Sequence, residues 1–273
     1  WSSDVCSSDL SEFQWAVSAN IGTYKTELTD LPSNVINKYA GDGVHDLILG
    51  RSPNSAYGLV ADGIFKTQEE VDAHADQPGK AVGRIRYKDL DGDGVINETY
   101  DRTWIGCYDP DFFGGLNFDF AYKGFDLNLF FEGMFGNDVN SDWKKESDIW
   151  LFTNPAWKNH ATRMLGGWSP DNPNSDIPAI SNNTANQEQR FSSWFIEDGS
   201  YIKLRNIELG YTFPTKLIKK MHMSNLRLYA AAYNVFTLKK FWGDDKYTSF
   251  DPERPSYHYL TPFTFNFGIN VSF

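Results

Sequence analysis

The chain has 273 residues, a formal net charge of −11 and an aromatic content of 16%. The negative charge argues against a nucleic-acid partner, because phosphate binding needs a basic surface, and no run reaches the roughly 18 consecutive apolar residues of a membrane-spanning helix. Many aromatic residues at a low mean hydropathy of −0.48 are typical of a transmembrane β-barrel, whose strands alternate lipid-facing and lumen-facing residues.

The first ten residues, WSSDVCSSDL, match nothing further along the chain. We expect residues 1–10 to be a non-native sequence artefact and residues 11–273 to be the protein proper. Cys6 would then have no biological role. The two cysteines, Cys6 and Cys107, could form a single disulfide but no framework of disulfides on which the fold could depend.

Six segments alternate apolar and polar residues with a period of two, which predicts strands with one apolar face. In chain order they are residues 13–21, 115–122, 125–135, 200–213, 225–238 and 263–273. Lys123 and Gly124 predict a tight hairpin between the second and third strands. The apolar phase slips by one at Arg205–Asn206, which predicts a bulge, and Pro214 ends that strand.

The connections between these strands are of two kinds. Those at about 27–111, 137–198 and 239–260 are long, and the two between them are short. Short turns at one end and long loops at the other are the pattern of an outer-membrane barrel, whose long loops are extracellular. The alternative is a soluble β-sandwich, but its strands are usually shorter and its turns more frequent.

The stretch YKDLDGDGVINETYDRTWIG, residues 87–106, resembles a calcium-binding loop of the EF-hand type. Gly94 permits the sharp turn at position 6, and Tyr100 stands at position 12, where a bidentate acid belongs. The alternative is an Asp/Gly turn with solvated carboxylates, and no amphipathic helices flank the loop as they would in a sensor. The candidate calcium ligands are Asp89, Asp91, Asp93, Val95 (through its carbonyl), Asn97 and Asp101.

Two further groups of residues are candidates for substrate contact. Loop tryptophans could stack on sugar rings, although a structural role is favoured for each of them: they are Trp143, Trp150, Trp157, Trp168, Trp194 and Trp242. Polar strand residues could line a path through a barrel: they are Asn117, Asp119, Asp126, Asn128 and Glu132. The five histidines show no metal-ligand spacing, and no nucleophile elbow occurs, so we assign no catalytic site.

Several blocks, in order, resemble the C-terminal part of the SusC/RagA-type TonB-dependent transporters of Bacteroidetes. They include ADGIFKTQEEVD, the calcium-type loop, FFGGLNFDFAYKGFDLNLFFEGMFGND, FIEDGSYIKLRNIELGYTFP, NVFTLKKFWGDD and the terminal FTFNFGINVSF. The resemblance covers residues 11–273. The usual form of the loop in that family lacks the extra residue before Asp101, which puts the closing ligand in doubt.

The resemblance implies the fold and the function. The fold would be all-β, the last six or so antiparallel strands of a large transmembrane barrel with long extracellular loops, with the plug and the N-terminal strands outside this chain. The protein would reside in the outer membrane of a Gram-negative bacterium and would import glycans or oligopeptides without enzymatic activity. No cofactor beyond calcium in the loop 89–101 is implied.

The partners implied are a SusD-like surface lipoprotein, the TonB complex through the missing N-terminal part, the surrounding lipid and the barrel-assembly machinery. That machinery would recognise Phe273, which is also the last aromatic residue of the terminal strand. Two alternatives remain open. One is a secreted, calcium-ordered carbohydrate-binding β-sandwich, and the other is an outer-membrane adhesin without transport.

Overall fold

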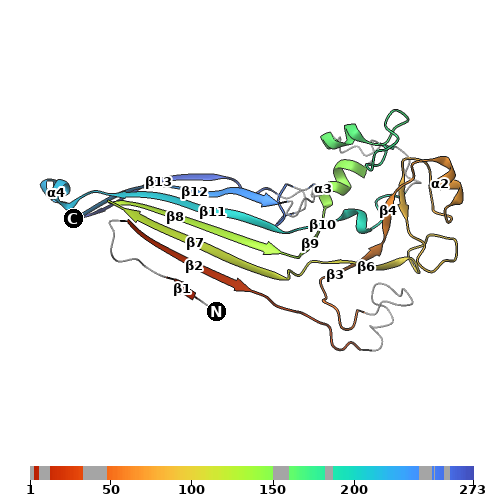
Figure 1. Ribbon diagram of the computed structural model, residues 1–273, viewed down its shortest axis with the longest axis horizontal. Helices are drawn as coiled ribbons and strands as arrows, with labels where there is room; N and C mark the ends of the chain where they lie inside the picture. The colour runs from red at the N-terminus through yellow and green to blue at the C-terminus, as the bar shows by residue number, and fades with distance from the viewer. Residues whose placement is uncertain are drawn as a thin grey trace.

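The computed structural model describes residues 3–5, 13–32, 48–149, 160–181, 187–239, 248, 250–254 and 259–273. One antiparallel sheet of seven strands dominates it, in the order β1-β2-β7-β8-β11-β12-β13 (Figure 1). These strands are β1 (Ser3–Val5), β2 (Phe13–Gly22), β7 (Phe112–Tyr122), β8 (Phe125–Phe135), β11 (Tyr201–Thr212), β12 (Asn225–Lys239) and β13 (Thr264–Ser272). Six of them are the predicted strands. The seventh, β1, comes from the ten residues set aside as non-native and pairs with β2.

The two short connections lie at one end of the sheet and have the predicted form. Lys123 and Gly124 have φ angles of 48° and 88°, which is the left-handed backbone that a two-residue hairpin turn requires. A Cβ atom on Gly124 would lie 2.7 Å from the carbonyl oxygen of Thr212, so the turn also needs glycine for space. After Pro214, helix α4 (Thr215–Ile218) and a single 3₁₀ turn, η5 (Lys219–Met221), lead into β12.

The predicted bulge lies in β11. Leu204 pairs with Phe131 of β8, whereas Asn206 pairs with the adjacent Phe130, so Arg205 is the extra residue. Against β12 the register also shifts at this point, but there Leu204 pairs with Phe236 and Asn206 with Tyr233, so β12 contributes the extra residue. Because side chains alternate between faces, the bulge keeps Leu204 on the same face as Ile207 although their spacing is odd.

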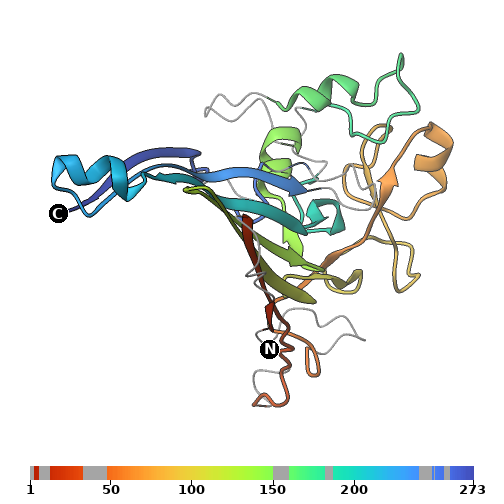
Figure 2. The ribbon, with the colours of Figure 1, turned by 60° about the vertical axis from the view of Figure 1, so that its left-hand side comes forward.

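The sheet curves along its width and leaves its two faces uncovered by a second sheet (Figure 2). One face is apolar: Trp15, Phe120 and Leu127 are successive partners across β2, β7 and β8. Phe267 and Ile269 of β13 remain 81% and 66% exposed on this face. In the described residues the remaining sheets have only two strands each, so those residues provide no second large sheet to pack against this one as in a β-sandwich.

The two longest connections fold together at the other end of the sheet (Figure 1). The first contributes β3 (Ser55–Leu59), β4 (Ala61–Ile64), α2 (Gln68–Ala73), β5 (Ile85–Tyr87) and β6 (Arg102–Cys107). The second contributes β9 (Asp138–Asn140), α3 (Asp142–Lys144), the π-helical turn η1 (Lys145–Ile149), the 3₁₀ helices η2 (Thr162–Gly166) and η4 (Ser193–Phe195), and β10 (Ile196–Asp198). We call this folded region the loop unit.

The main hydrophobic core lies in the loop unit and not on the sheet. It is a cluster of buried side chains from both connections: Leu59, Ile64, Ile85, Tyr87, Ile96, Ile149 and Phe195. In the described part of the sheet, by contrast, apolar side chains such as Leu209 and Phe267 remain exposed. Within the part of the chain that the structure describes, no helix has the length and apolar character needed to cross a membrane.

Candidate functional site

The acidic loop lies between β5 and β6 on the surface of the loop unit. Its backbone pairs with a neighbouring segment: the Asp76 N–H donates to the Gly94 carbonyl at 2.7 Å, and the Ile96 N–H donates to the Asp76 carbonyl at 2.9 Å. The Ile96 side chain enters the core. The loop is therefore a fixed part of the loop unit, held by an apolar residue directly after its turn.

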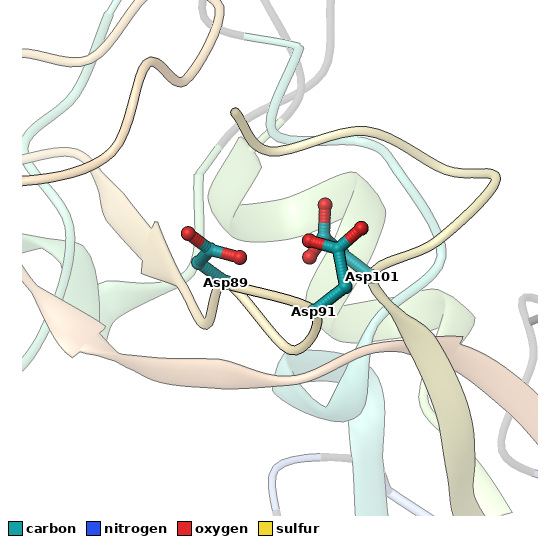
Figure 3. A group of neighbouring side chains, drawn as sticks. All are labelled: Asp89, Asp91 and Asp101. Atoms are coloured by element: carbon teal, nitrogen blue, oxygen red, sulfur yellow. The ribbon is translucent and has the colours of Figure 1, made fainter. Parts of the chain in front are cut away.

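Three carboxylates gather on this turn (Figure 3). Asp89, Asp91 and Asp101 can each present an oxygen within 4.8 Å of the others. Asp89 also accepts hydrogen bonds from the backbone N–H groups of Gly92 at 2.7 Å and Gly94 at 2.9 Å. Oxygen ligands at such spacing are those that Ca²⁺ prefers.

Asp101 closes the loop from within. Its side chain is fully buried, with one oxygen accepting from the Leu90 N–H at 2.8 Å and the other from the Asn97 N–H at 2.7 Å. The extra residue before Asp101, which the sequence shows as a departure from the EF-hand spacing, therefore does not remove this carboxylate from the turn. Each oxygen retains a lone pair for a cation.

The other predicted ligands make local contacts instead. An Asp93 oxygen accepts from the Val95 N–H at 2.7 Å. The Asn97 side-chain oxygen accepts from Thr99 and Tyr100 N–H groups at 2.9 and 3.0 Å, and the Val95 carbonyl accepts from the Asn97 amide at 3.5 Å. The structure thus brings together three of the four predicted aspartates and places Asp93, Val95 and Asn97 in turn-forming contacts.

The electrostatics of the turn favour a cation. The Gly94 N–H is the largest influence on Asp89 and lowers the pKa of its carboxyl. For Asp91, the Asp93 N–H lowers the pKa, but slight desolvation and the charges of Asp93 and Asp101 outweigh it, so the pKa of Asp91 is raised. This repulsion between carboxylates is the kind that a bound divalent ion relieves.

The polar face of the sheet carries a second cluster, which crosses three strands. Asn128 donates to Asn117 at 2.9 Å and to Asp119 at 2.7 Å, and it accepts from Asn206 at 3.1 Å. All four side chains lie on the face opposite the exposed phenylalanines. Along β7, β8 and β11 they alternate with the apolar residues, and the pairing register places them on the same side of the sheet.

Two arginines extend this polar cluster toward both ends of the sheet. Arg227 of β12 binds Asp126 and lies 2.7 Å from Glu208, while Arg205 lies 2.6 Å from Glu132. The five predicted polar strand residues therefore all take part in hydrogen bonds or ion pairs on one face. Arg227 and Glu208 were not singled out in the sequence, although their place in the polar phase could have identified them.

At the loop end of the sheet, ion pairs hold the connection between β12 and β13 against the polar face. Lys203, only 4% exposed, lies 2.7 Å from Asp251 and also binds Glu253, which in turn binds Arg205. The Tyr201 hydroxyl donates to Glu253 at 2.9 Å. Asp251 and Glu253 lie in a segment without periodicity, so no sequence pattern could have predicted these contacts.

A cavity of about 650 Å³ opens beside this attachment. It is lined by acidic and aromatic residues of the sheet end and the loop unit, including Tyr108, Asp138, Asp142, Tyr201 and Glu253. Burial raises the pKa of the Asp138 carboxyl, and the hydrogen bond from the Cys107 N–H offsets only part of this shift. Polar and aromatic groups therefore meet where the sheet joins the loop unit.

A buried ion pair links the two long connections. Arg84 lies 2.8 Å from Glu188, each side chain is 6% exposed, and the second Glu188 oxygen accepts from the Ile85 N–H at 2.9 Å. Burial raises the pKa of Glu188 and lowers the pKa of Arg84. Desolvation thus outweighs the attraction between the two charges, so the pair positions the connections more than it stabilises them.

The described loop tryptophans pack within the loop unit. Trp168 and Trp194 pack against the core cluster. The Trp143 ring packs edge-on against Phe250, with ring centroids 4.7 Å apart. These contacts agree with the structural role favoured from the sequence. Trp150, Trp157 and Trp242 lie outside the described residues. Phe273 follows the last strand and is 89% exposed.

Comparison with known proteins gives consistent relatives. TonB-dependent receptor P3 of Formosa agariphila is 30% identical over 280 residues, which cover 96% of this chain and 27% of the relative. TonB-dependent receptor SusC of Bacteroides thetaiotaomicron is 25% identical over 275 residues, covering 96% of this chain and 25% of the relative. No protein-family model matches the chain. The chain therefore spans about a quarter of the length of the curated relatives it matches.

The fold has a counterpart among solved structures. The structure of the RagAB peptide transporter superimposes with a TM-score of 0.72 at 21% identity, over 100% of this chain and 28% of that one. The same transporter in an open-open state gives a TM-score of 0.69. At this identity the likeness concerns the fold alone.

Proposed function

Because this chain belongs to the SusC/RagA-type TonB-dependent receptors and spans about a quarter of their length, we propose that it forms part of the barrel wall of an outer-membrane transporter. The cargo would be glycans or oligopeptides, imported with energy from the TonB complex. The chain itself would contribute no enzymatic step. Its two faces and its loop unit each support part of this proposal.

The observation that carries the proposal is the chemical difference between the two faces of one sheet. The polar face holds hydrogen-bonded amides and ion pairs from β7 to β12, centred on Asn128 and Arg227. The opposite face exposes aromatic and aliphatic side chains, such as Phe267. In a membrane barrel the first face borders a polar lumen and the second borders lipid.

The loop unit would lie on the extracellular side. Long connections at that end and short turns at the other are the arrangement of outer-membrane barrels. A folded and ion-paired loop unit offers a defined surface for a SusD-like lipoprotein, which would cover the mouth. Contact with TonB and closure of the lumen would fall to the rest of the full-length protein.

The exposed C-terminal Phe273 fits recognition by the barrel-assembly machinery. It follows β13, whose phenylalanines stay exposed on the apolar face. An aromatic residue at the end of an alternating strand is also a girdle residue at the membrane boundary. The two roles are compatible, since assembly precedes insertion.

The acidic loop would bind calcium and thereby order the outer surface of the loop unit. Asp89, Asp91 and Asp101 would supply the carboxylate ligands, since their oxygens approach one another within 4.8 Å. The bound ion would supply charge neutralisation at the turn and no chemistry on the cargo. This role fits a position far from the polar face of the sheet.

Growth of the source bacterium tests the proposed uptake. The full-length gene is deleted, and growth is measured on a panel of glycans and oligopeptides as sole nutrient. We expect loss of growth on one nutrient class, restored by the wild-type gene but not by a version without its TonB-interacting segment. Unchanged growth on every nutrient would contradict the transporter role and favour an adhesin.

A further inference from the structure

The connection between β11 and β12 has an unusual composition for this protein. Residues 213–224 include Lys216, Lys219, Lys220 and His222 but no acidic residue, in a chain whose net charge is −11. Short turns suffice to join barrel strands at this end, yet this one forms α4 and η5. The segment is thus a local basic site at the end of the sheet that is remote from the loop unit (Figure 1).

The helical segment is amphipathic, and its apolar side chains point in two directions. Ile218 is buried at 3% exposure, which anchors the segment to the sheet end, whereas Leu217 and Met221 are 63% and 64% exposed. Leu217 lies in α4 and Met221 in the 3₁₀ turn η5, and the three lysines of the same short segment are also exposed.

The neighbouring strand ends show the depth at which the segment lies. The Tyr211 ring packs against Phe125 in a tilted arrangement and against Phe213 edge-on, with ring centroids 4.5 and 5.0 Å apart, and Tyr122, the partner of Phe125, is exposed beside them. Such a group of aromatic residues marks the membrane–water boundary of a barrel. Pro214 and α4 follow Phe213 directly, so the basic segment begins at the level of the lipid headgroups.

We propose that the α4–η5 segment is an interfacial anchor that binds anionic phospholipid headgroups on the periplasmic side of the membrane. Leu217 and Met221 enter the boundary between headgroups and acyl chains, while Lys216, Lys219 and Lys220 contact the phosphates. A basic amphipathic helix binds lipid surfaces by this combination of apolar burial and charge. The inference rests on the proposed barrel role.

The test uses the full-length protein in vesicles of equal parts phosphatidylcholine and phosphatidylglycerol. In a background with Cys107→Ser and any other native cysteine replaced, Met221→Cys carries an environment-sensitive fluorophore. Bromine-labelled acyl chains, which quench the probe on contact, are placed on phosphatidylglycerol in one sample and on phosphatidylcholine in the other. We expect stronger quenching by phosphatidylglycerol, with the difference decreasing as salt is added.

The matched variant replaces Lys216, Lys219 and Lys220 by Gln and leaves Ile218 in place. Its preference for phosphatidylglycerol should fall by about fivefold for each lysine removed. Equal quenching by the two lipids in the wild-type segment would overturn the proposal, as would a probe reached only by a water-soluble quencher.

A second probe separates this proposal from the barrel role. Leu209→Cys lies on the apolar face of β11, and a probe there should be quenched by both lipids without preference. Quenching at position 209 with none at position 221 overturns only the anchor. Absence of lipid quenching at position 209 overturns the barrel role on which the anchor depends.

Discussion

Asp101 shows how a single buried carboxylate can decide the shape of a loop. Its two oxygens accept N–H groups from Leu90 and Asn97, on opposite sides of the turn. The sequence indicated a loop rich in aspartate but placed Asp101 one residue beyond the expected closing position. The structure shows that the backbone absorbs the extra residue, because the carboxylate still reaches both strands of the turn.

Replacing Asp101 by Ala should loosen this turn. Two N–H groups would lose a charged acceptor, and each such hydrogen bond contributes about 1.5–3 kcal/mol. Hydrogen exchange should therefore speed up across residues 89–101 in the full-length protein. Asp93→Asn is the matched control, because that exposed side chain retains an acceptor for Val95, and its exchange should match the wild type.

Calcium should protect the same turn. Ion binding by Asp89, Asp91 and Asp101 would relieve their repulsion and restrain the backbone, so limited proteolysis near residues 89–101 should slow when calcium is added. The protection should disappear with a chelator and in the double variant Asp89→Asn, Asp91→Asn. Equal cleavage rates in calcium and in chelator would contradict the proposed site.

The two long connections behave as one folded element because they share a core and an ion pair. Leu59 and Ile85 of the first pack with Phe195 of the second, and Arg84 binds Glu188 across them. None of this was predictable from periodicity, because the strands and helices of the loop unit have three to six residues each. Such short elements bury isolated side chains and leave no repeating pattern.

Glu188→Ala should destabilise the loop unit by about 3–5 kcal/mol, because it leaves the Arg84 charge buried without its partner. The measurement is the free energy of local opening from hydrogen exchange at Ile85 and Leu59. The double variant Arg84→Met, Glu188→Gln removes both charges and keeps an acceptor for the Ile85 N–H. The double variant should lower the free energy of local opening by clearly less than Glu188→Ala does. An equal loss would contradict the argument that desolvation of the pair offsets its attraction.

Six of the seven strands of the sheet, in contrast, were predictable from the sequence, as was the bulge in β11. Long strands with strict alternation, such as 263–273, leave a strong signal, and the phase slip at Arg205–Asn206 could be read directly. The hydrogen bonds between Asn117, Asn128 and Asn206 could not be predicted, because the register between strands depends on turns and on long-range pairing. Composition and alternation thus predicted the faces of the wall but not the contacts across it.

At the scale of the whole molecule, the described residues place the core at one end and an exposed apolar face along the sheet. A water-soluble protein seldom exposes so continuous an apolar surface. In a barrel wall that face needs no protein cover, because lipid provides it, and the loop unit must then supply its own core. The central claim is therefore that each side chain of the sheet faces either the lipid or the lumen of the barrel, as its position in the strand determines.

A cysteine scan along β11 tests this claim most directly. Single cysteines at positions 202–211 of the full-length protein in vesicles are labelled with a fluorophore and exposed to lipid-borne or water-soluble quenchers. We predict lipid quenching at Ile202, Ile207 and Leu209 and aqueous quenching at Glu208, with the alternation changing phase at Arg205. Aqueous quenching of all positions, or alternation that runs unbroken through Arg205, would contradict the account.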